Sequence, residues 1–460
     1  MQSVLVNGKG QFQGCLDDPS NPDCDEAGCP AEEYLSPLPV EAGKTYLFRI
    51  INAASLVSLT FAMADHNMTV VRADGTYVEP VEVSSLEVNV GQRYSVLVTA
   101  DQAPDMSYWA TVTGPRGLMG YSYLQYDGSA PPDGNYTTPT LVEDGPAIDK
   151  MLFSKNVQAH PNPDILAGDV TPARSSVIVT AQALHPPSGQ ELYTSNNVSN
   201  SLHAPVPLVT LAYESLKKPN AKAWPETDIP GTVEVPDLAP VIWNFSATPR
   251  DAGVTLVSED HGLAVFKAVH GDVIDMVFQN TVGSRGMAGS HAWHLHGHQM
   301  YVIGQGSGTF DPDSDPDSYN LVNPVLRDTF SVWNFGWTAI RFKADNPGAW
   351  PLHCTMLAHA VTGMGFNLVT SPDLLSAPPP GLESCYKTSV NPEEAQVCTL
   401  KSELDEAGSD ALDISRTGGG SASESKEAVS SSTGGVLMSP HVALLAGAFV
   451  FGLAFNFGWI

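Results

Sequence analysis

The feature that most restricts the fold is a glycine followed by a strand of alternating apolar residues, and it occurs twice. Gly43 precedes Tyr46, Phe48, Ile50 and Asn52. At the same offsets, Gly271 precedes Ile274, Met276, Phe278 and Asn280. Successive side chains of a strand point to opposite faces, so this spacing predicts strands with one buried face. A glycine turn before such a strand is common in β-sandwiches, and its repetition favours duplication of one sandwich over two unrelated folds.

Further strand-like segments occupy both halves of the chain. In the first half they cover residues 44–51, 85–90, 93–100 and 108–114. In the second half they cover residues 175–182, 239–247, 264–280, 300–306 and 338–344. The 36 prolines and 40 glycines among 460 residues favour many turns. We expect an all-β protein with sandwich domains at 1–150 and 165–376, a partly disordered linker at 377–435 and an apolar tail at 436–460.

The charge of the chain argues against one class of partner. It carries 50 acidic and 22 basic residues, for a formal net charge of −28. Such a surface repels phosphate backbones, so we expect no nucleic-acid partner.

Sequons and cysteines indicate the secretory pathway. Four Asn-X-Ser/Thr sequons predict glycosylation at Asn67, Asn135, Asn197 and Asn244. Cys385 and Cys398 bracket a short polar loop and predict a disulfide, whereas the pairing among Cys15, Cys24 and Cys29 stays open. The opening "MQSVLVNGKGQFQGC" has no apolar signal region. We therefore expect the natural N-terminus to lie upstream of Met1.

The C-terminal tail is expected to attach the protein to a membrane. Residues 441–460 are apolar and about long enough to span a bilayer. Small residues at 430–432 and a polar spacer precede them, which matches a GPI-attachment signal. A single-pass anchor and a tail without a membrane role are the alternatives. Either anchor places the protein on the extracellular face of a membrane.

Histidines gather beside one cysteine in the second domain. The segment "SHAWHLHGHQM" holds His291, His294, His296 and His298, and "HCTMLAHAVTGM" holds His353, Cys354, His359 and Met364. One thiolate, two imidazoles and a thioether suit copper, whereas structural zinc more often takes two or more thiolates. His291, Cys354, His359 and Met364 thus predict a trigonal copper site with a weak axial methionine.

Strand alternation predicts a second group of ligands beside the first. If Cys354 faces its own copper, His353 and position 355 face the other side. His294 and His296 lie two residues apart and share a direction. A second metal cluster is therefore expected one residue away from the first, with the Cys354–His353 backbone as the path for electrons.

These motifs resemble those of three-domain multicopper oxidases of the laccase and ascorbate oxidase group. "HAWHLHGH" is similar to the family's HPxHxHGH, with Ala292 in place of proline, and "HCTMLAHAVTGM" is similar to HCHxxxHxxxGM. Weaker matches are "GQRYSVLVTAD", "ADGTYVEPV" and "NPVLRDTFSV". The resemblance covers about residues 1–372 and implies the second and third cupredoxin-like Greek-key domains, with the first domain missing.

The resemblance also implies a role for each ligand. The type 1 copper, which takes electrons from a reducing substrate, would bind His291, Cys354, His359 and Met364. His294 matches a type 2 ligand, and His296 and His353 match type 3 ligands. In the family these coppers reduce O₂ to water, and the reductant is a phenol-like molecule, ascorbate or a metal ion. His298 and His66 match positions outside the copper shell.

Thr355 departs from the motif, because the family has a histidine there. A neutral hydroxyl is a poor copper ligand beside imidazole. The missing first domain predicts a truncated oxidase. Together with Thr355 it predicts a chain impaired in O₂ reduction whose type 1 site is intact. The alternatives are a surface protein that uses type 1 copper alone, for electron transfer or copper binding, and a structural protein that keeps only the fold.

Overall fold

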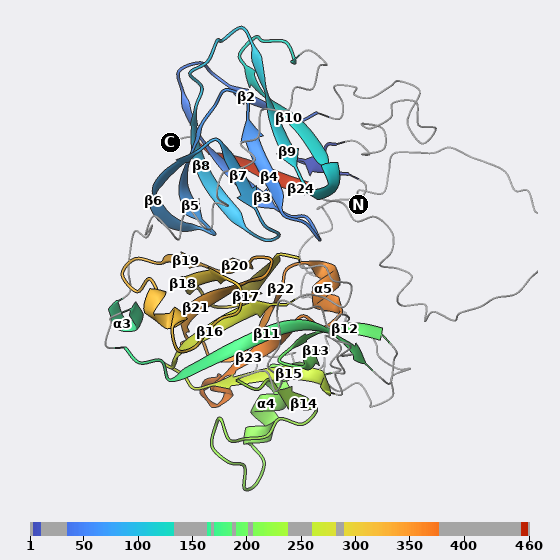
Figure 1. The fold of residues 1–460 in the computed structure, drawn as a ribbon, viewed down its shortest axis with the longest axis vertical. Helices are drawn as coiled ribbons and strands as arrows, with labels where there is room; N and C mark the ends of the chain where they lie inside the picture. Colours follow the sequence, from blue (N-terminus) through green and yellow to red (C-terminus); the bar gives the residue numbers. More distant parts are fainter. Residues whose placement is uncertain are drawn as a thin grey trace, which may run out of the picture. The chain divides into compact units, whose positions relative to one another are not determined.

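The computed structural model describes residues 3–10, 35–132, 163–166, 170–185, 190–200, 206–237, 260–281, 289–376 and 452–458. Within them, the first half of the chain forms one β-sandwich and the second half forms another (Figure 1). The segment at 239–247, the whole linker at 377–435, and all cysteines other than Cys354 lie outside the described residues. Asn135 and Asn244 lie outside them as well.

The first sandwich has two sheets. A six-stranded sheet has the order β1-β24-β3-β8-β5-β6, and a five-stranded sheet has the order β2-β10-β9-β4-β7. The strands of the first sheet are β1 (Leu5–Val6), β3 (Thr45–Asn52), β5 (Met68–Ala73), β6 (Thr76–Val83), β8 (Arg93–Thr99) and β24 (Gly452–Gly458). Those of the second are β2 (Pro37–Val40), β4 (Leu59–Met63), β7 (Ser85–Val88), β9 (Ser107–Thr113) and β10 (Met119–Tyr126).

The second sandwich is built from one continuous hydrogen-bonded path of described strands. Its order is β19-β18-β21-β16-β11-β12-β13-β15-β23-β22-β17-β20, with β14 paired to β15. The first strands along the chain are β11 (Arg174–His185), β12 (Gln190–Ser195), β13 (Val198–Asn200), β14 (Thr232–Glu234), β15 (Asp260–Ala268), β16 (Val273–Asn280) and β17 (His291–Leu295). The remainder are β18 (Met300–Ser307), β19 (Val325–Arg327), β20 (Thr329–Val332), β21 (Gly336–Lys343), β22 (Gly348–Cys354) and β23 (Gly365–Thr370).

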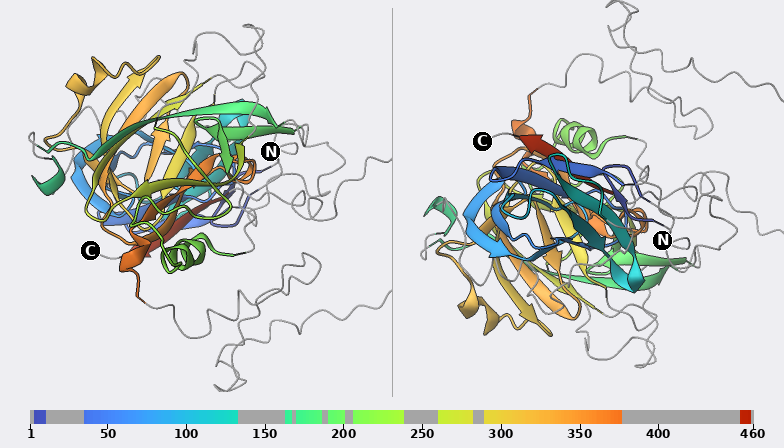
Figure 2. Two further views of the ribbon diagram at one scale, coloured as in Figure 1. Left: turned by 90° about the horizontal axis from the view of Figure 1, so that it is seen from below. Right: turned by 90° about the horizontal axis from the view of Figure 1, so that it is seen from above.

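Short helices join these strands. They are α3 (Pro163–Leu166), α4 (Leu208–Leu216), α5 (Leu357–Val361) and the 3₁₀ turns η2 (Pro115–Gly117), η3 (Asp315–Ser318) and η4 (Pro372–Leu374). Figure 2 shows α4 on the outside of the second sandwich, where Leu208 and Ala212 pack with Val265 of β15 and Val369 of β23. The most important helix for the metal centre is α5, since it carries His359.

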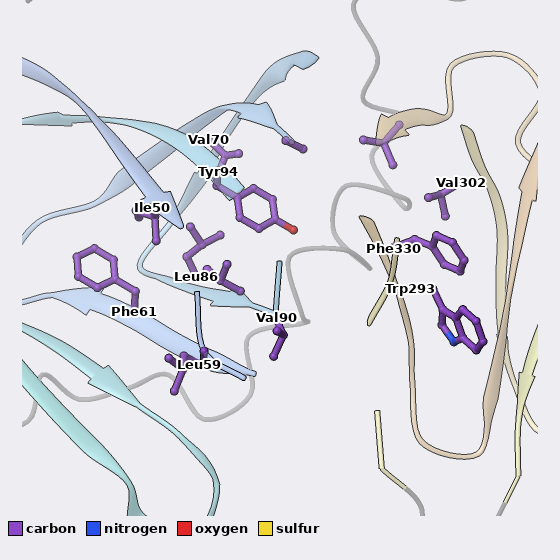
Figure 3. Packing of buried hydrophobic residues seen from close by; sticks show 14 of the residues in the cluster. Ile50, Leu59, Phe61, Val70, Leu86, Val90, Tyr94, Trp293, Val302 and Phe330 are labelled. Atoms are coloured by element: carbon purple, nitrogen blue, oxygen red, sulfur yellow. The ribbon is translucent and has the colours of Figure 1, made fainter. Parts of the chain in front are cut away.

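The repeated glycine turns produce the strands that the sequence predicts. Gly43 and Gly271 both have positive φ, of 80° and 93°, which glycine adopts without steric cost. The strands that follow, β3 and β16, bury Phe48 and Phe278 to within 1% exposure. Figure 3 shows such core residues from both sandwiches, among them Ile50 and Phe61 in the first and Trp293 and Phe330 in the second.

In the part of the C-terminal tail that the structure describes, the chain forms a strand. Gly452–Gly458 forms β24, which pairs antiparallel with β3 and parallel with β1. Among the described residues, no helix is long and apolar enough to cross a membrane. The membrane anchor therefore stays a prediction.

Candidate metal centre

The two histidine-bearing motifs lie on neighbouring antiparallel strands, β17 and β22. Their register pairs Trp293 with Cys354 and His294 with His353. Paired residues share a face and alternate residues return to it, so His291 lies on the face of Cys354. His294 and His353 lie on the opposite face. This is the division that the sequence predicts.

The first face brings together His291, Cys354 and His359. The Cys354 Sγ lies 3.9 Å from the His291 Nδ1 and 3.7 Å from the His359 Nδ1, and the two Nδ1 atoms are 3.1 Å apart. Only this set, among the described residues, groups three or more metal-ligating side chains so closely. A metal that binds imidazole nitrogen at about 2 Å and thiolate sulfur at about 2.3 Å fits between atoms with this spacing.

A short helical turn follows Cys354 and leads to two further predicted ligands, His359 and Met364. β22 ends at Cys354, and α5 places His359 beside it. The Met364 backbone N–H then donates to the His359 carbonyl, and the Cys354 N–H donates to the Met364 carbonyl. Met364 is fully buried. These backbone bonds hold the cysteine, histidine and methionine in one compact loop.

Burial sets the protonation of this centre. It lowers the pKa of His291 to about 3, with the charge of His359 adding to the effect, and lowers the pKa of His359 to about 4. It also raises the pKa of the Cys354 thiol to about 12. Both imidazoles are therefore neutral near pH 7, which metal binding requires. The thiol must release its proton to bind.

The second face holds His294, His296 and His353. The Nε2 atoms of His296 and His353 lie 3.0 Å apart, and the His294 ring centroid is 4.8 Å from that of His296. The Nδ1 of His353 donates to the Cys354 carbonyl, and that of His294 donates to the Asp328 carbonyl. In both rings the proton is therefore on Nδ1 and the lone pair is on Nε2, the nitrogen that a metal ligand needs. In His353 this Nε2 faces the Nε2 of His296.

Burial also acts on the pKa of two members of this second group, His296 and His353. It lowers the pKa of His296, with His294 and His353 adding to the effect. It lowers the pKa of His353 as well, and the hydrogen bond to the Cys354 carbonyl only partly opposes this. Three imidazole rings grouped this closely make a donor set that fits copper.

Thr355 does not join this group as a ligand. Its hydroxyl donates to the Val90 carbonyl of the first sandwich at 2.8 Å and lies 3.2 Å from the Ala292 carbonyl. Its methyl group is packed against Gly91, where an added Cβ would lie 3.1 Å from it. The residue that departs from the motif therefore forms a contact between the two sandwiches.

The comparisons with known proteins agree with this geometry. Two family models, both described as multicopper oxidase, match residues 1–129 and 236–374. The chain belongs to the multicopper oxidase family. It is 31% identical over 400 residues to an L-ascorbate oxidase of Cucumis sativus, covering 85% of this chain and 64% of that protein. It is 33% identical over 365 residues to Laccase-2 of Oryza sativa subsp. japonica, covering 76% and 62%.

Solved multicopper oxidases share the cupredoxin-like fold. A laccase from Botrytis aclada has 25% identity and a TM-score of 0.56, covering 80% of this chain and 58% of that chain. Fet3p, a multicopper oxidase that functions in iron import, has 23% identity and a TM-score of 0.57, covering 80% and 65%. The chain thus spans slightly less than two thirds of the length of the relatives it matches.

A cleft gives access to the cysteine-bearing centre of this multicopper oxidase chain. Its volume is about 920 Å³, and it is lined by Glu87 and Arg116 from the first sandwich and by Tyr193, His291 and His359 from the second. The Tyr193 ring lies 4.6 Å from the His359 ring and 5.9 Å from the His291 ring, centroid to centroid. Burial raises the pKa of its hydroxyl to about 12, so the ring is neutral.

Sequence reasoning missed Tyr193 and Asp328. Tyr193 lies on β12, far from both histidine motifs in the sequence, and no spacing signals its role. The Asp328 carboxyl is partly buried, which alone would raise its pKa, but hydrogen bonds from Arg93 and the charge of that residue lower the pKa overall. Asp328 lies in "NPVLRDTFSV", one of the weaker family matches.

The other predicted residues lie apart from both faces. His298 is buried between Phe342 and Trp350, and its Nδ1 donates to the His296 carbonyl. His66 is buried in the first sandwich and hydrogen-bonds the Ala64 carbonyl and the Tyr126 hydroxyl. Asn67 is exposed, and Asn197 is half-buried with a positive φ of 68°. Glycosylation at both stays a prediction.

Proposed function

We propose that this chain is the electron-accepting part of a laccase-like multicopper oxidase. The observation that carries the proposal is the convergence of His291, Cys354 and His359 to within 3.9 Å of one another, beside a cleft that the two histidines line. Bound there, copper would supply a one-electron acceptor for a reducing substrate. The candidate substrates are a phenol-like molecule, ascorbate or a metal ion.

The residues of the chain divide the work. His291 and Cys354 are buried and exclude water from the ligand atoms, whereas His359 is half-buried and reaches the cleft. Tyr193 covers the rings of both histidines. His353 follows Leu352 on β22 and is bonded to Cys354 through the backbone, so the peptide between them leads to the second group of histidines.

In the complete enzyme we propose that electrons pass on to O₂, which is reduced to water. In this chain we propose that the O₂ step is impaired, because Thr355 stands where the motif has a histidine. Its hydroxyl donates to the Val90 carbonyl and also lies beside the Ala292 carbonyl. The same observation favours the second candidate, a surface protein that carries electrons or copper through the cysteine site alone. The four sequons and the apolar tail support a glycosylated protein of the secretory pathway, held on the extracellular face of a membrane.

Copper titration of the purified chain tests the proposal. The wild-type chain should bind copper with an intense thiolate-to-copper absorption band, and Cys354→Ser should abolish the band. Met106→Ala, at an exposed position of the first sandwich, is the matched control and should retain it. A wild-type chain without the band contradicts the proposal.

Oxygen uptake with a reducing substrate separates the two candidates. Thr355→Val removes the hydroxyl at nearly unchanged volume and should leave the copper content unchanged. Low uptake in both proteins supports the electron-transfer candidate. Sustained reduction of O₂ to water by the wild-type chain contradicts the proposed impairment.

A further inference from the structure

Three consecutive residues of the second sandwich, Arg327, Asp328 and Thr329, are each bound by the first sandwich. The Arg327 Nε donates to the Asp74 Oδ2 at 2.8 Å, and its Nη1 donates to the Tyr94 hydroxyl at 2.8 Å. Figure 3 shows the Tyr94 hydroxyl directed away from the core residues Ile50 and Phe61. The Thr329 N–H donates to the Asp74 Oδ2 at 3.2 Å.

Asp328, the middle residue, is held by both arms of one guanidinium. The Arg93 Nη1 and Nη2 donate to its Oδ1 and Oδ2, each at 2.6 Å. Arg93 also donates to the carbonyls of Gly91 and Asp74, so the guanidinium is fixed on its other edges as well. A planar guanidinium matches a carboxylate with two parallel bonds, which a lysine ammonium cannot do.

The same segment orients His294. The His294 Nδ1 lies 2.8 Å from the Asp328 carbonyl oxygen and 3.2 Å from the Thr329 hydroxyl. A carbonyl oxygen only accepts hydrogen bonds, so the Nδ1 carries the proton and the Nε2 keeps its lone pair. A hydrogen bond at one ring nitrogen decides which nitrogen is open to a metal.

We propose that Arg93 is a positioning residue for His294. Through its two bonds to Asp328, it fixes the carbonyl of that residue and so holds His294 with the proton on Nδ1 and with Nε2 free. The first sandwich then contributes to the second group of histidines without supplying a ligand from its described residues. The inference rests on the proposed function in one respect: copper is the metal that the free Nε2 of His294 would bind.

The tautomer of His294 tests this proposal without any metal. Long-range ¹⁵N imidazole spectra of the full metal-free chain report which ring nitrogen carries the proton, and His294→Gln assigns the signals. The wild-type chain should show the Nδ1–H form. Arg93→Met keeps the length and apolar stem of the side chain, and it should shift His294 to a mixture of the two tautomers. Arg93→Lys, which keeps the charge, should restore the Nδ1–H form in part.

Arg174→Met is the matched control, because Arg174 also pairs with an aspartate, Asp237, and donates to a backbone carbonyl. It should leave the His294 signals unchanged. An unchanged tautomer in Arg93→Met would overturn the proposal. So would an equal change in both variants, since that indicates a general loss of structure.

Copper binding gives an independent readout. In copper-loaded chains, Arg93→Met should weaken binding at the His294 group by about 10- to 100-fold, as loss of an outer hydrogen-bond partner commonly does. The electron paramagnetic resonance signal of that copper follows its occupancy. The thiolate-to-copper band of Cys354 should be retained in Arg93→Met, and loss of both the band and the paramagnetic resonance signal would overturn the proposal.

Failure of the proposed function can be told apart from failure of this inference. A wild-type chain without the band contradicts the proposed function, whereas the His294 tautomer still decides the role of Arg93.

Discussion

At the scale of single residues, burial favours the neutral form of each titratable group in the cysteine-bearing centre. His291, at 7% exposure, is buried at the lining of the cleft, and Cys354, at 0%, lies in the apolar core. A buried imidazole resists protonation and a buried thiol resists deprotonation, because each charged form loses its hydration. The neutral imidazoles can accept a metal at once, but the thiol gains a stable anionic form only when a cation lies beside it.

This burial predicts how the stability of the metal-free chain depends on pH. The pKa of His291 is lowered to about 3 in the folded chain, mainly by burial, whereas an unfolded imidazole titrates near about 6.5. The unfolded state therefore binds more protons between these values, and the unfolding free energy falls as the pH drops below about 6.5. At about pH 5 the loss from His291 alone is about 2 kcal/mol.

Urea unfolding of the metal-free chain at neutral and acidic pH measures this loss. His291→Gln keeps a polar group that does not titrate, so the drop in unfolding free energy should be smaller by about 2 kcal/mol. An equal drop in the variant and the wild-type chain would contradict the lowered pKa.

At the scale of elements, the end of β19 is joined to the turn between β5 and β6 by a buried ion pair. The side chains of Arg327 and Asp74 are 1% and 0% exposed. Asp74 has a positive φ of 47°, a conformation that aspartate and asparagine tolerate better than most residues. The carboxylate also accepts a hydrogen bond from the Arg93 N–H. Removal of this charge would leave the Arg327 guanidinium buried without compensation.

We expect Asp74→Asn to lower the unfolding free energy by about 3–5 kcal/mol, because one partner of a buried pair is lost. Asparagine suits the backbone conformation, so the change isolates the charge. Glu41→Gln is the matched control, since Glu41 pairs with Lys44 at the surface, with 51% and 44% of their side chains exposed. It should change stability by no more than about 1 kcal/mol. Chemical denaturation compares the two variants, and similar small effects would refute the role of the buried pair.

At the scale of the whole molecule, the two ends of the described chain meet in one sheet. β24 pairs residue by residue with β3, from Leu453 opposite Asn52 to Gly458 opposite Leu47, and with β1 on its other side. A strand with neighbours on both sides cannot accommodate proline without loss of a ladder bond. The apolar character of the tail suits a sheet strand as well as a membrane anchor.

Hydrogen exchange distinguishes these two uses of the tail. Phe455→Pro should speed the exchange of those β3 amides that face β24, whereas Phe455→Ala should leave the β3 amides protected. Mass spectrometry of peptides that cover Thr45–Asn52 measures the exchange. Equal protection in all three chains would show that β3 does not depend on β24 and would favour the anchor.

Much of the fold follows from local sequence alone. Strand alternation correctly predicts β3, β8, β9 and β21, with boundaries that differ by one or two residues. The predicted segment 264–280 instead covers parts of two strands, β15 and β16, with a turn at Gly271 between them. The fold of two β-sandwiches and the multicopper oxidase family are confirmed. The pairing in β24 was not predicted, because an apolar segment with small residues has no period that separates a strand from a membrane segment.

The sequence by itself determined the ligand types, their spacing and the division of His291 and Cys354 from His294 and His353. All of these depend on the two-residue period of a strand and on the donor chemistry of the side chains. Only the tertiary structure decided that Tyr193 covers the cleft side of the centre, that Thr355 hydrogen-bonds the Val90 carbonyl, and that Arg93 donates two hydrogen bonds to Asp328. Each of these contacts joins residues about a hundred or more positions apart in the sequence. The Tyr193 contacts depend on how distant strands of one sandwich are brought together, and the other two depend on how the two sandwiches pack. No local pattern of residues encodes either arrangement.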